Sequence, residues 1–397
     1  MLEGKIMATI KLYDRDAYAT SFEAKVLSCV KQEVVNTHGD TGVVYEVILD
    51  QTLFFPEEGG QTSDKGTLGG AEVFYVQIKN DVITHILTEP LEEGAMVKGE
   101  IDWQHRFYNM QQHSGEHLFS GLAYKKYGYR NVGFHLSNQI VTMDFDGVFT
   151  EEQLLEMEWA INEAIVANVE IKTSYPAKEE LANLEYRSKI EIDGPVRIVE
   201  IDGYDMCACC APHVHRTGEI GIFKIQSVQN YKGGVRISFL CGFRALEEYR
   251  KKSQIISELS GILTTNQDLL AENVSKLKAQ TQSLKSQLVN AKQIIMENKI
   301  ENIPAEQKDV LLFETDLDTS VMRNVVNKLV EKHEGICGVF VGSDTEGYRY
   351  ILGSKTIDCR VIATKMRIKL GAKGGGSAKM IQGSVQASEE QMLGIIR

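Results

Sequence analysis

The sequence of 397 residues is poor in proline, with only 6, and no apolar run approaches the roughly 18 residues needed to span a bilayer. Its 34 glycines follow no collagen-like repeat, and no proline-rich or mucin-like tract is present. Hydrophobic residues make up 43% and charged residues 25%, which is typical of globular proteins. These features exclude membrane-spanning and fibrous classes and predict two or three globular domains.

The N-terminal stretch offers neither an apolar signal core nor a small-residue cleavage site, so nothing predicts secretion. The seven cysteines are an odd number, and Cys207, Cys209 and Cys210 fall within four positions. This spacing is awkward for a disulfide framework and typical of thiolate chemistry in a reducing compartment. We therefore expect a cytoplasmic protein with no membrane partner.

The net charge of −12 argues at first against a nucleic-acid partner, but the charge is unevenly distributed. Residues 1–245 carry 36 acidic and 22 basic side chains, whereas residues 360–397 carry 2 acidic and 7 basic ones. A bound polyanion would therefore release counterions mainly at the C-terminal end.

The sequence predicts an α+β protein, and its first half divides into two regions. Residues 1–100 alternate in short strand-like pieces between glycine-rich turns, which predicts a small β-barrel-like N-terminal domain. Residues 101–245 show helical periodicity over 104–127 and again over 150–168, followed by strands. We expect this second region to be an α/β core.

The second half of the chain also divides into two regions. Residues 246–303 contain a heptad series with a half-polar companion series, which predicts a long helical arm. The leading series is Leu263, Leu270, Leu277, Leu284 and Ala291. The arm could fold as a hairpin linking two domains, or it could pair between chains and give a homodimer through the C-terminal half. Residues 304–397 alternate strands and helices, which predicts a compact C-terminal α/β domain.

Two clusters of candidate metal ligands lie in the second region. His113 and His117 are spaced i and i+4, so one helical face carries both imidazoles. Cys209 and His213 add a thiolate and an imidazole inside a strand-rich segment. Together the four side chains form a soft tetrahedral set that suits zinc.

Neighbouring residues leave alternatives open. Cys207 could replace Cys209, and His215 could replace His213. Residues 113–117 also match H-x-x-E-H, the inverzincin pattern in which Glu116 would serve as general base. Because Glu116 lies about 100° around the helix from His117, we expect it to form a salt bridge or face solvent. His135 has no partner at ligand spacing and is expected to be structural.

These residues resemble the editing domain of alanyl-tRNA synthetase and its free-standing AlaX-type relatives, which pair H-x-x-x-H with C-x-x-x-H. The matching ligands are His113, His117, Cys209 and His213. Further resemblance lies in Leu49–Pro56 with Gly59, Gly60, Gln61 and Asp64, and in Asp102, Trp103 and Arg106. Lys373–Gly376, with Met380 and Gln382, is similar to the glycine loop of the C-terminal domain shared with DHH-type phosphoesterases. The resemblance runs from about Tyr13 to Gln382.

The sequence departs from the family pattern at three places. Glu58 stands where many members have another glycine, and Pro212 replaces the usual threonine before the final histidine. Residues 377–379 read Ser-Ala-Lys where Arg-Pro-Asp is common. The first two departures bear on substrate preference, and the third bears on RNA contact.

The resemblance implies a long AlaX-type hydrolase that acts in trans with one Zn²⁺ per chain. Residues 1–12 leave no room for an aminoacylation domain, so we expect the chain not to charge tRNA. A pocket built for alanine rejects serine by only about a hundredfold, and smaller glycine also enters, so a second sieve is needed. The expected substrate is tRNA-Ala mischarged with serine or glycine.

Thr52 and Gln61 are the candidate catalytic residues that would read the misattached amino acid. Each also has a plain structural interpretation, because Thr52 could bond to local backbone at a strand end and Gln61 could hold its glycine turn. The candidate RNA-binding residues surround the C-terminal glycine loop over 371–383, where backbone N–H groups and cations suit phosphates. They are Lys369, Lys373, Gly374, Gly375, Gly376 and Lys379.

Two competing functions remain open at this point. A zinc peptidase would use His113, Glu116 and His117, but it would also need a downstream carboxylate ligand, which the Cys-x-x-x-His cluster disfavours. A zinc-stabilised tRNA-binding module without hydrolysis would keep the same ligands.

Overall fold

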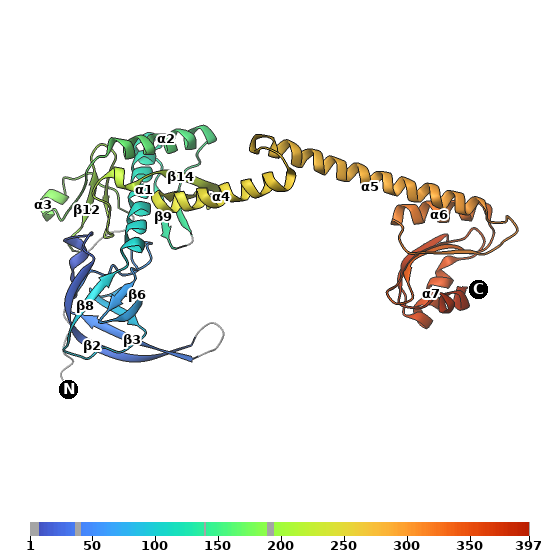
Figure 1. Ribbon diagram of the computed structural model, residues 1–397, viewed down its shortest axis with the longest axis horizontal. Coiled ribbons are helices and arrows are strands. Elements are labelled where there is room, and N and C mark those ends of the chain that lie inside the picture. The colour runs from blue at the N-terminus through green and yellow to red at the C-terminus, as the bar shows by residue number, and fades with distance from the viewer. Residues whose placement is uncertain (1–7, 36–40, 139, 189–193, 397) are drawn as a thin grey trace. The chain divides into compact units, whose positions relative to one another are not determined.

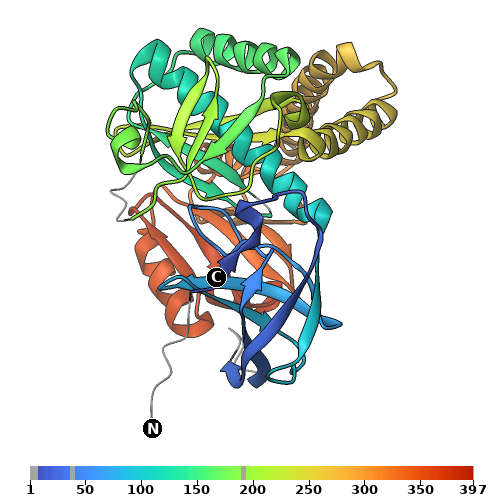
Figure 2. The ribbon, with the colours of Figure 1, turned by 90° about the vertical axis from the view of Figure 1, so that its left-hand side faces the viewer.

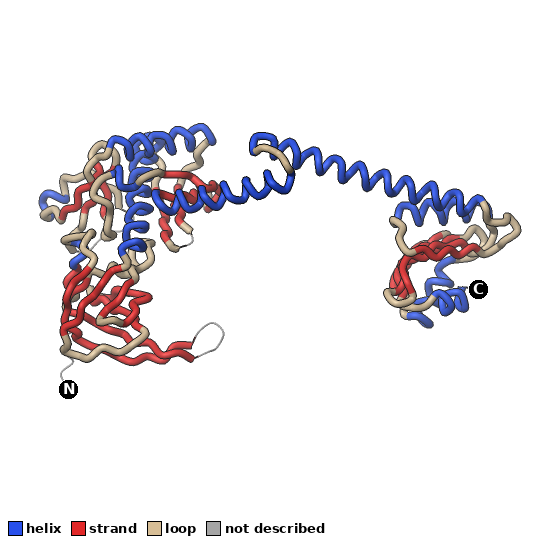
Figure 3. Tube along the Cα trace, in the orientation of Figure 1, coloured by secondary structure: helices blue, strands red, loops and turns tan. Residues whose placement is uncertain are grey.

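The computed structural model describes residues 8–35, 41–138, 140–188 and 194–396. It is a mixed α/β protein with helices and strands in both halves of the chain (Figure 3). Two compact units comprise residues 1–255 and residues 256–397, and each is described by itself. Among the described helices, none is long and apolar enough to cross a membrane. The four-part division expected from the sequence stays a prediction.

Six strands of the first unit pair in the closed order β2-β3-β7-β6-β5-β8, which makes a barrel (Figure 1). Alternate residues of β6 are buried and exposed, as the period of a strand with one face in a core requires. Two short strands, β1 and β4, pair in parallel beside the barrel. The bounds are β1 Ile10–Lys11, β2 Ser21–Val35, β3 Thr41–Leu49, β4 Gln51–Thr52, β5 Gly66–Leu68, β6 Ala71–Lys79, β7 Val82–Leu87 and β8 Met96–Ile101.

Helix α1, Trp103–Tyr127, follows the barrel directly and leads into the rest of the unit (Figure 2). The Asp102 side chain caps its first turn by accepting from the His105 N–H, and Gly128 ends it in the left-handed conformation. Helix α2, Glu151–Ala167, begins with a capping box at Thr150. Both helices were expected from the sequence with nearly these bounds.

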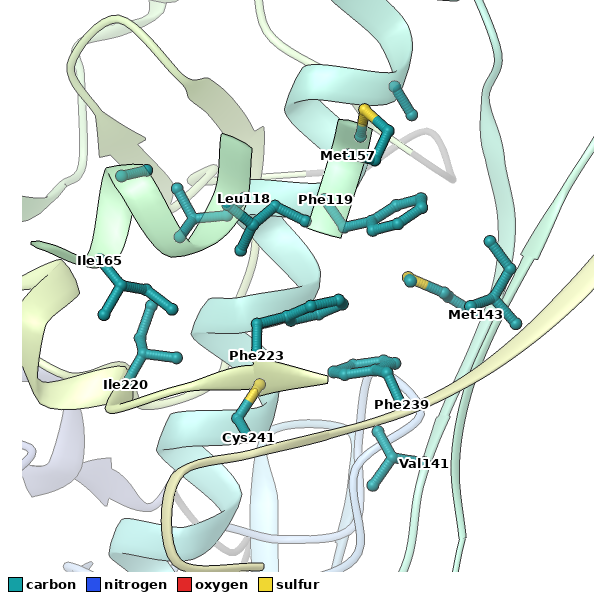
Figure 4. Close-up of a cluster of buried hydrophobic side chains, with 14 of the residues drawn as sticks. Leu118, Phe119, Val141, Met143, Met157, Ile165, Ile220, Phe223, Phe239 and Cys241 are labelled. Carbon is teal, nitrogen blue, oxygen red and sulfur yellow. The ribbon is translucent and has the colours of Figure 1, made fainter. Parts of the chain in front are cut away.

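Two sheets surround α1, with orders β14-β15-β10-β9 and β11-β12-β13. Phe119, Met143, Met157 and Phe223 from four elements meet in one apolar core (Figure 4). The bounds are β9 Asn131–Leu136, β10 Val141–Phe145, β11 Ile171–Ser174, α3 Lys178–Leu181, β12 Ile198–Ile201, β13 Asp205–Ala208, β14 Phe223–Tyr231 and β15 Gly234–Cys241. This core holds α1 in place although many side chains of the helix are polar.

The expected arm is two helices, α4 (Gly242–Leu263) and α5 (Leu270–Glu301). A turn over 264–269 separates the two helices and lies between Leu263 and Leu270, the first two members of the heptad series. Within α5, Leu277, Leu284 and Leu288 are 52%, 64% and 54% exposed. Whether this seam pairs with another helix stays a prediction.

The second unit contains a five-stranded sheet of order β16-β17-β18-β20-β19. Residues of α5 and α6 pack in one apolar cluster with the sheet, and those of α7 and α8 pack in another. The bounds are β16 Val310–Glu314, α6 Thr319–Lys332, β17 Cys337–Ser343, β18 Gly347–Gly353, α7 Cys359–Leu370, β19 Lys373–Gly376, β20 Met380–Val385 and α8 Glu389–Ile396. The glycine segment was expected to be a loop, but β19 is an edge strand paired with β20. Pairing with a partner strand thus gives glycines a β conformation that they do not favour alone.

Candidate metal centre

Four predicted ligands, two from α1 and two from the loop after β13, come together in the first unit. The donor atoms of His113, His117, Cys209 and His213 all lie within 4.8 Å of one another. The Cys209 Sγ is 3.5 Å from His113 Nε2 and 3.4 Å from His213 Nε2. All three histidines are buried, so water competes little for their nitrogens.

Each histidine of the group has a hydrogen-bond partner at Nδ1. Such a contact fixes the tautomer and turns Nε2 toward a metal, which is the usual arrangement of metal-binding imidazoles. The three contacts are His113 with Gln61 Oε1 at 2.8 Å, His117 with Asp205 Oδ2 at 2.9 Å, and His213 with Ser114 Oγ at 3.1 Å. The Nε2 atom of each ring is therefore the one left to face the Cys209 sulfur.

The electrostatics of the group favour a thiolate. Burial by itself raises the pKa of Cys209, but the imidazoles of His113 and His213 lower it well below its ordinary value. Burial lowers the pKa of His213 to about 3, so this ring is neutral and can act as a ligand. For His117, burial lowers the pKa, yet hydrogen bonds to Asp205 and Cys209 raise it to about 10.

This donor set fits a zinc ion. One thiolate and three imidazole nitrogens are the donors that zinc prefers, and tetrahedral sites use four of them. The hydrogen bonds at Nδ1 supply the outer contacts that such sites require. The binding of Zn²⁺, one per chain, stays a prediction.

The alternative ligands have other roles. Cys207 lies in a second group with His117 and Asp205, but burial raises the pKa of its thiol, which disfavours a thiolate. His215 is exposed and stacks on Tyr18, with ring centroids 3.9 Å apart, and no metal-binding group among the described residues includes it.

Glu116 does not face solvent, and its Oε2 lies 3.9 Å from His117 Nε2, so the structure supports the salt-bridge alternative of that expectation. It is 2% exposed, and its Oε1 accepts hydrogen bonds from Ser120 Oγ at 2.6 Å and Asn131 Nδ2 at 2.5 Å. The partners come from α1 itself and from β9, which the helical wheel alone could not show. His135 lies exposed on β9, outside the metal-binding groups of the described residues.

Gln61 reaches His113 from a tight turn between β4 and β5. Glu58 and Gln61 pair across Gly59 and Gly60, whose φ angles are +62° and +85°. A Cβ on Gly60 would lie 2.2 Å from the Phe134 carbonyl oxygen, so only glycine allows this contact with β9. The Gln61 side chain is fully buried, and its Nε2 has no hydrogen-bond partner among the described residues.

A buried ion pair anchors the segment that carries this turn. Arg106 on α1 donates from Nε to Asp64 Oδ1 at 2.9 Å and from Nη2 to the Leu53 carbonyl at 2.6 Å. Both charged side chains are fully buried. The resemblance had included Asp64 and Arg106 without explaining them, and their contact ties the turn to the metal-bearing helix.

Thr52 lies in the same segment but bonds elsewhere. Its hydroxyl is 2.8 Å from His85 Nε2 and accepts from the Phe54 N–H at 3.1 Å. Since His85 Nδ1 lies 3.1 Å from the Val47 carbonyl, its Nε2 is the acceptor and Thr52 is the donor. Both hydrogen-bonding functions of the threonine are thus used inside the barrel.

The candidate RNA-binding residues all lie in the second unit. Lys369 is in the last turn of α7, Lys373 and Gly374–Gly376 form β19, and Lys379 is in the turn before β20. Arg367 donates to the Gly374 carbonyl at 3.0 Å, which adds a further cation to this hairpin.

Sequence reasoning missed Asp205, Ser114 and Arg187. Arg187 donates from Nε and Nη2 to the two Asp205 oxygens, both at 2.7 Å, and holds the carboxylate that orients His117. These contacts lower the pKa of Asp205 although burial raises it. Ser114 directly follows the ligand His113 in the sequence, but this adjacency alone does not indicate a role in orienting a ligand.

Two family models match parts of the chain. The model described as threonyl and alanyl tRNA synthetase second additional domain covers residues 196–238, which include Cys209 and His213. The model of class II (A) tRNA synthetases covers residues 3–105. The barrel and the ligand loop are therefore similar to domains described for tRNA synthetases.

Whole-chain comparisons point to free-standing relatives. The alanyl-tRNA editing protein Aarsd1 of Danio rerio is 29% identical over 94% of this chain and 93% of its own length. Aarsd1-B of Xenopus laevis is 30% identical over 68% of each chain, and AlaX-L of Pyrococcus horikoshii is 26% identical over 97% of this chain and 96% of its own. The chain belongs to the family of alanyl-tRNA editing proteins of the AlaX type.

Proposed function

We propose that this protein hydrolyses, in trans, the ester bond of tRNA-Ala mischarged with serine or glycine. The observation that carries the proposal is the convergence of His113, His117, Cys209 and His213, whose donor atoms lie within 4.8 Å of one another. The relatives are named alanyl-tRNA editing proteins, and the similarity covers nearly their whole length. Their names support the reaction class.

The four ligands would hold one Zn²⁺. When bound there, the ion would supply a Lewis-acidic positive charge beside the aminoacyl group. The protein's own part is to orient the three imidazoles with Nε2 toward the ion and to keep the Cys209 thiol deprotonated. Gln61, Asp205 and Ser114 orient the rings by fixing the Nδ1 side of each.

Gln61 is the better supported of the two proposed catalytic residues. Because its Oε1 accepts from His113, its NH₂ group points away from that ring, and it is buried without a partner among the described residues. A substrate ester carbonyl or a serine hydroxyl could accept its hydrogen bond. A buried donor that stays unpaired without the right substrate is the kind of group that gives strong discrimination.

Thr52 has less support as a reader of the amino acid, because its hydroxyl already donates to His85 and accepts from Phe54. Its contribution would be to hold the strand end from which the Gln61 segment starts. RNA contact by Lys369, Lys373, Lys379 and Gly374–Gly376 also belongs to the proposal. Cytoplasmic localisation and a homodimer through the C-terminal half stay predictions from the sequence.

A deacylation assay with purified protein and seryl- and glycyl-tRNA-Ala tests this function. We expect release of the amino acid by the wild type, and loss of release by Cys209→Ala with tRNA affinity unchanged. Cys29→Ala, in the barrel, is the matched control and should keep activity. Binding of tRNA without turnover would indicate a non-catalytic module, and cleavage of peptides would indicate a peptidase; either result would overturn the proposal.

A further inference from the structure

A cavity of about 940 Å³ lies in the first unit behind the metal centre. Its walls come from the C-terminal half of α1, the segment 184–188 before the next strand, and the hairpin of β12 and β13. The metal ligands do not line it. Its lining includes Asp205 and Cys207, which share a group of donor atoms within 4.8 Å with His117. Asp205 therefore lines the cavity and also bonds to the metal ligand His117.

The walls carry the groups that recognise a nucleotide. Tyr124 lies on the cavity and is 46% exposed, so its ring can stack on a base. Lys125 and Arg130 are cations that suit a phosphate, and the Asp202 carboxylate suits ribose hydroxyls. The mixture of two tyrosine rings, cations and carboxylates fits a nucleoside with one phosphate better than a run of phosphates.

The size of the cavity limits its occupant. Ligand pockets of about 300–1,000 Å³ hold small molecules, and a double-stranded RNA stem is far too wide. The unpaired 3′ end of an RNA can enter such a cavity with one nucleotide. Because the ester is attached to the terminal ribose, that nucleoside must bind within about one ribose of the metal centre.

Two further cavities of the described residues do not meet this requirement. One lies in the second unit, and one lies around Thr9, Arg15, Asp81 and Tyr175, and neither is lined by a metal ligand or by its hydrogen-bond partner. In the cavity behind the metal centre, Arg187 lines the wall and bonds to Asp205, which orients His117. A wall residue is thus linked to a ligand through two hydrogen-bonded contacts.

We propose that this cavity binds the 3′-terminal nucleoside of the tRNA, with Tyr124 stacking on the base and Arg130 contacting the adjoining phosphate. The inference rests on the proposed deacylase function, since it names where the substrate's end is held. Arg187 is then a positioning residue that joins the nucleoside site to the His117 side of the metal centre.

Binding of 5′-AMP to the zinc-supplemented full-length protein, measured by calorimetry, tests the site directly. We expect wild-type protein to bind AMP, and Tyr124→Ala and Arg130→Gln each to weaken binding about tenfold, the loss of one stacking or charged contact. Tyr249→Ala and Arg250→Gln on α4 are matched exposed controls and should bind as wild type. In deacylation, the two cavity variants should raise KM more than they lower kcat.

The outcomes separate the two proposals. AMP binding that depends on Tyr124 and Arg130 supports the nucleoside site even if no deacylation is found, in which case only the proposed function fails. Absence of AMP binding, or equal binding and equal KM in all four variants of a protein that deacylates normally, would overturn the nucleoside site and leave the function standing.

Discussion

Three imidazoles meet at Cys209 because a different side chain holds the far nitrogen of each. Spacing along the chain predicted the ligands, since i and i+4 positions share a helical face. It could not predict the contacts of Gln61 and Asp205, which lie 52 and 88 positions from the histidines that they orient. Contacts between distant segments form only when the fold brings their backbones together, so the sequence pattern contains no trace of them.

Replacing Gln61 tests the importance of one such contact. We expect Gln61→Ala to weaken zinc binding about 10- to 100-fold, because His113 loses the acceptor that fixes its tautomer. Competition with a chelator of known affinity measures this loss. Gln51→Ala, whose side chain bonds to the Glu23 carbonyl in the barrel, is the control and should retain wild-type affinity. Equal affinity in the Gln61 variant would remove the orienting role.

A second residue-scale prediction concerns pH. Burial lowers the pKa of His85 to about 4 from the ordinary value of 6.5. Between these values the unfolded chain binds the proton and the folded chain does not, so folding stability falls as pH drops. The loss from this residue reaches about 3 kcal/mol when both states are protonated. Urea unfolding from pH 7 to pH 4 should show a weaker pH dependence for His85→Gln than for wild type; identical dependences would contradict the assignment.

At the scale of elements, the sequence predicted the helices that have clear hydrophobic periodicity and a capping residue. Asp102 and Thr150 cap the N-termini of helices α1 and α2, and their side chains bond to the first turn in the structure. The β19–β20 hairpin was missed because three consecutive glycines carry no strand preference and only pairing with β20 extends them. The buried glutamines of α1 were equally uninformative, since Gln111 and Gln112 bond to carbonyl groups of other segments.

The turn that carries Gln61 supplies an element-scale prediction. Gly60 and Gly70 both have positive φ, +85° and +90°, so alanine at either position costs about 1–3 kcal/mol of strain. At Gly60 the new Cβ would also meet the Phe134 carbonyl oxygen, whereas at Gly70 nothing lies within 4 Å. Gly60→Ala should therefore lower the free energy of unfolding more than Gly70→Ala and should alone weaken zinc binding. Equal effects of the two variants in urea unfolding and chelator competition would show that the close approach is unimportant.

At the scale of the whole molecule, the candidate metal centre and the basic C-terminal segment lie in different units. The metal centre lies within residues 1–255, whereas the basic C-terminal segment lies within 256–397. Two-unit division was within reach of the sequence from the change in pattern near the helical arm. The position of the turn at 264–269 was not, because leucines continue in heptad positions on both sides of it.

Charge reversal in the C-terminal hairpin tests the role of the second unit. Lys373→Glu with Lys379→Glu should weaken tRNA binding and reduce the slope of log affinity against log salt by about 2, one for each lost phosphate contact. Lys308→Glu with Lys332→Glu changes the same charge elsewhere in the unit and should alter the slope less. Filter binding over a range of salt concentrations measures both. An unchanged slope in the hairpin variant would place the RNA contact elsewhere.

Removal and return of zinc is the most direct test of the central claim that the four converging side chains form a hydrolytic metal centre. The deacylation rate of seryl-tRNA-Ala would be measured for the purified protein, for the same protein stripped by a chelator, and after one equivalent of Zn²⁺ per chain is restored. The account predicts loss of hydrolysis on stripping and recovery at one ion per chain, with no recovery in His117→Ala. Undiminished hydrolysis by fully stripped protein would contradict it.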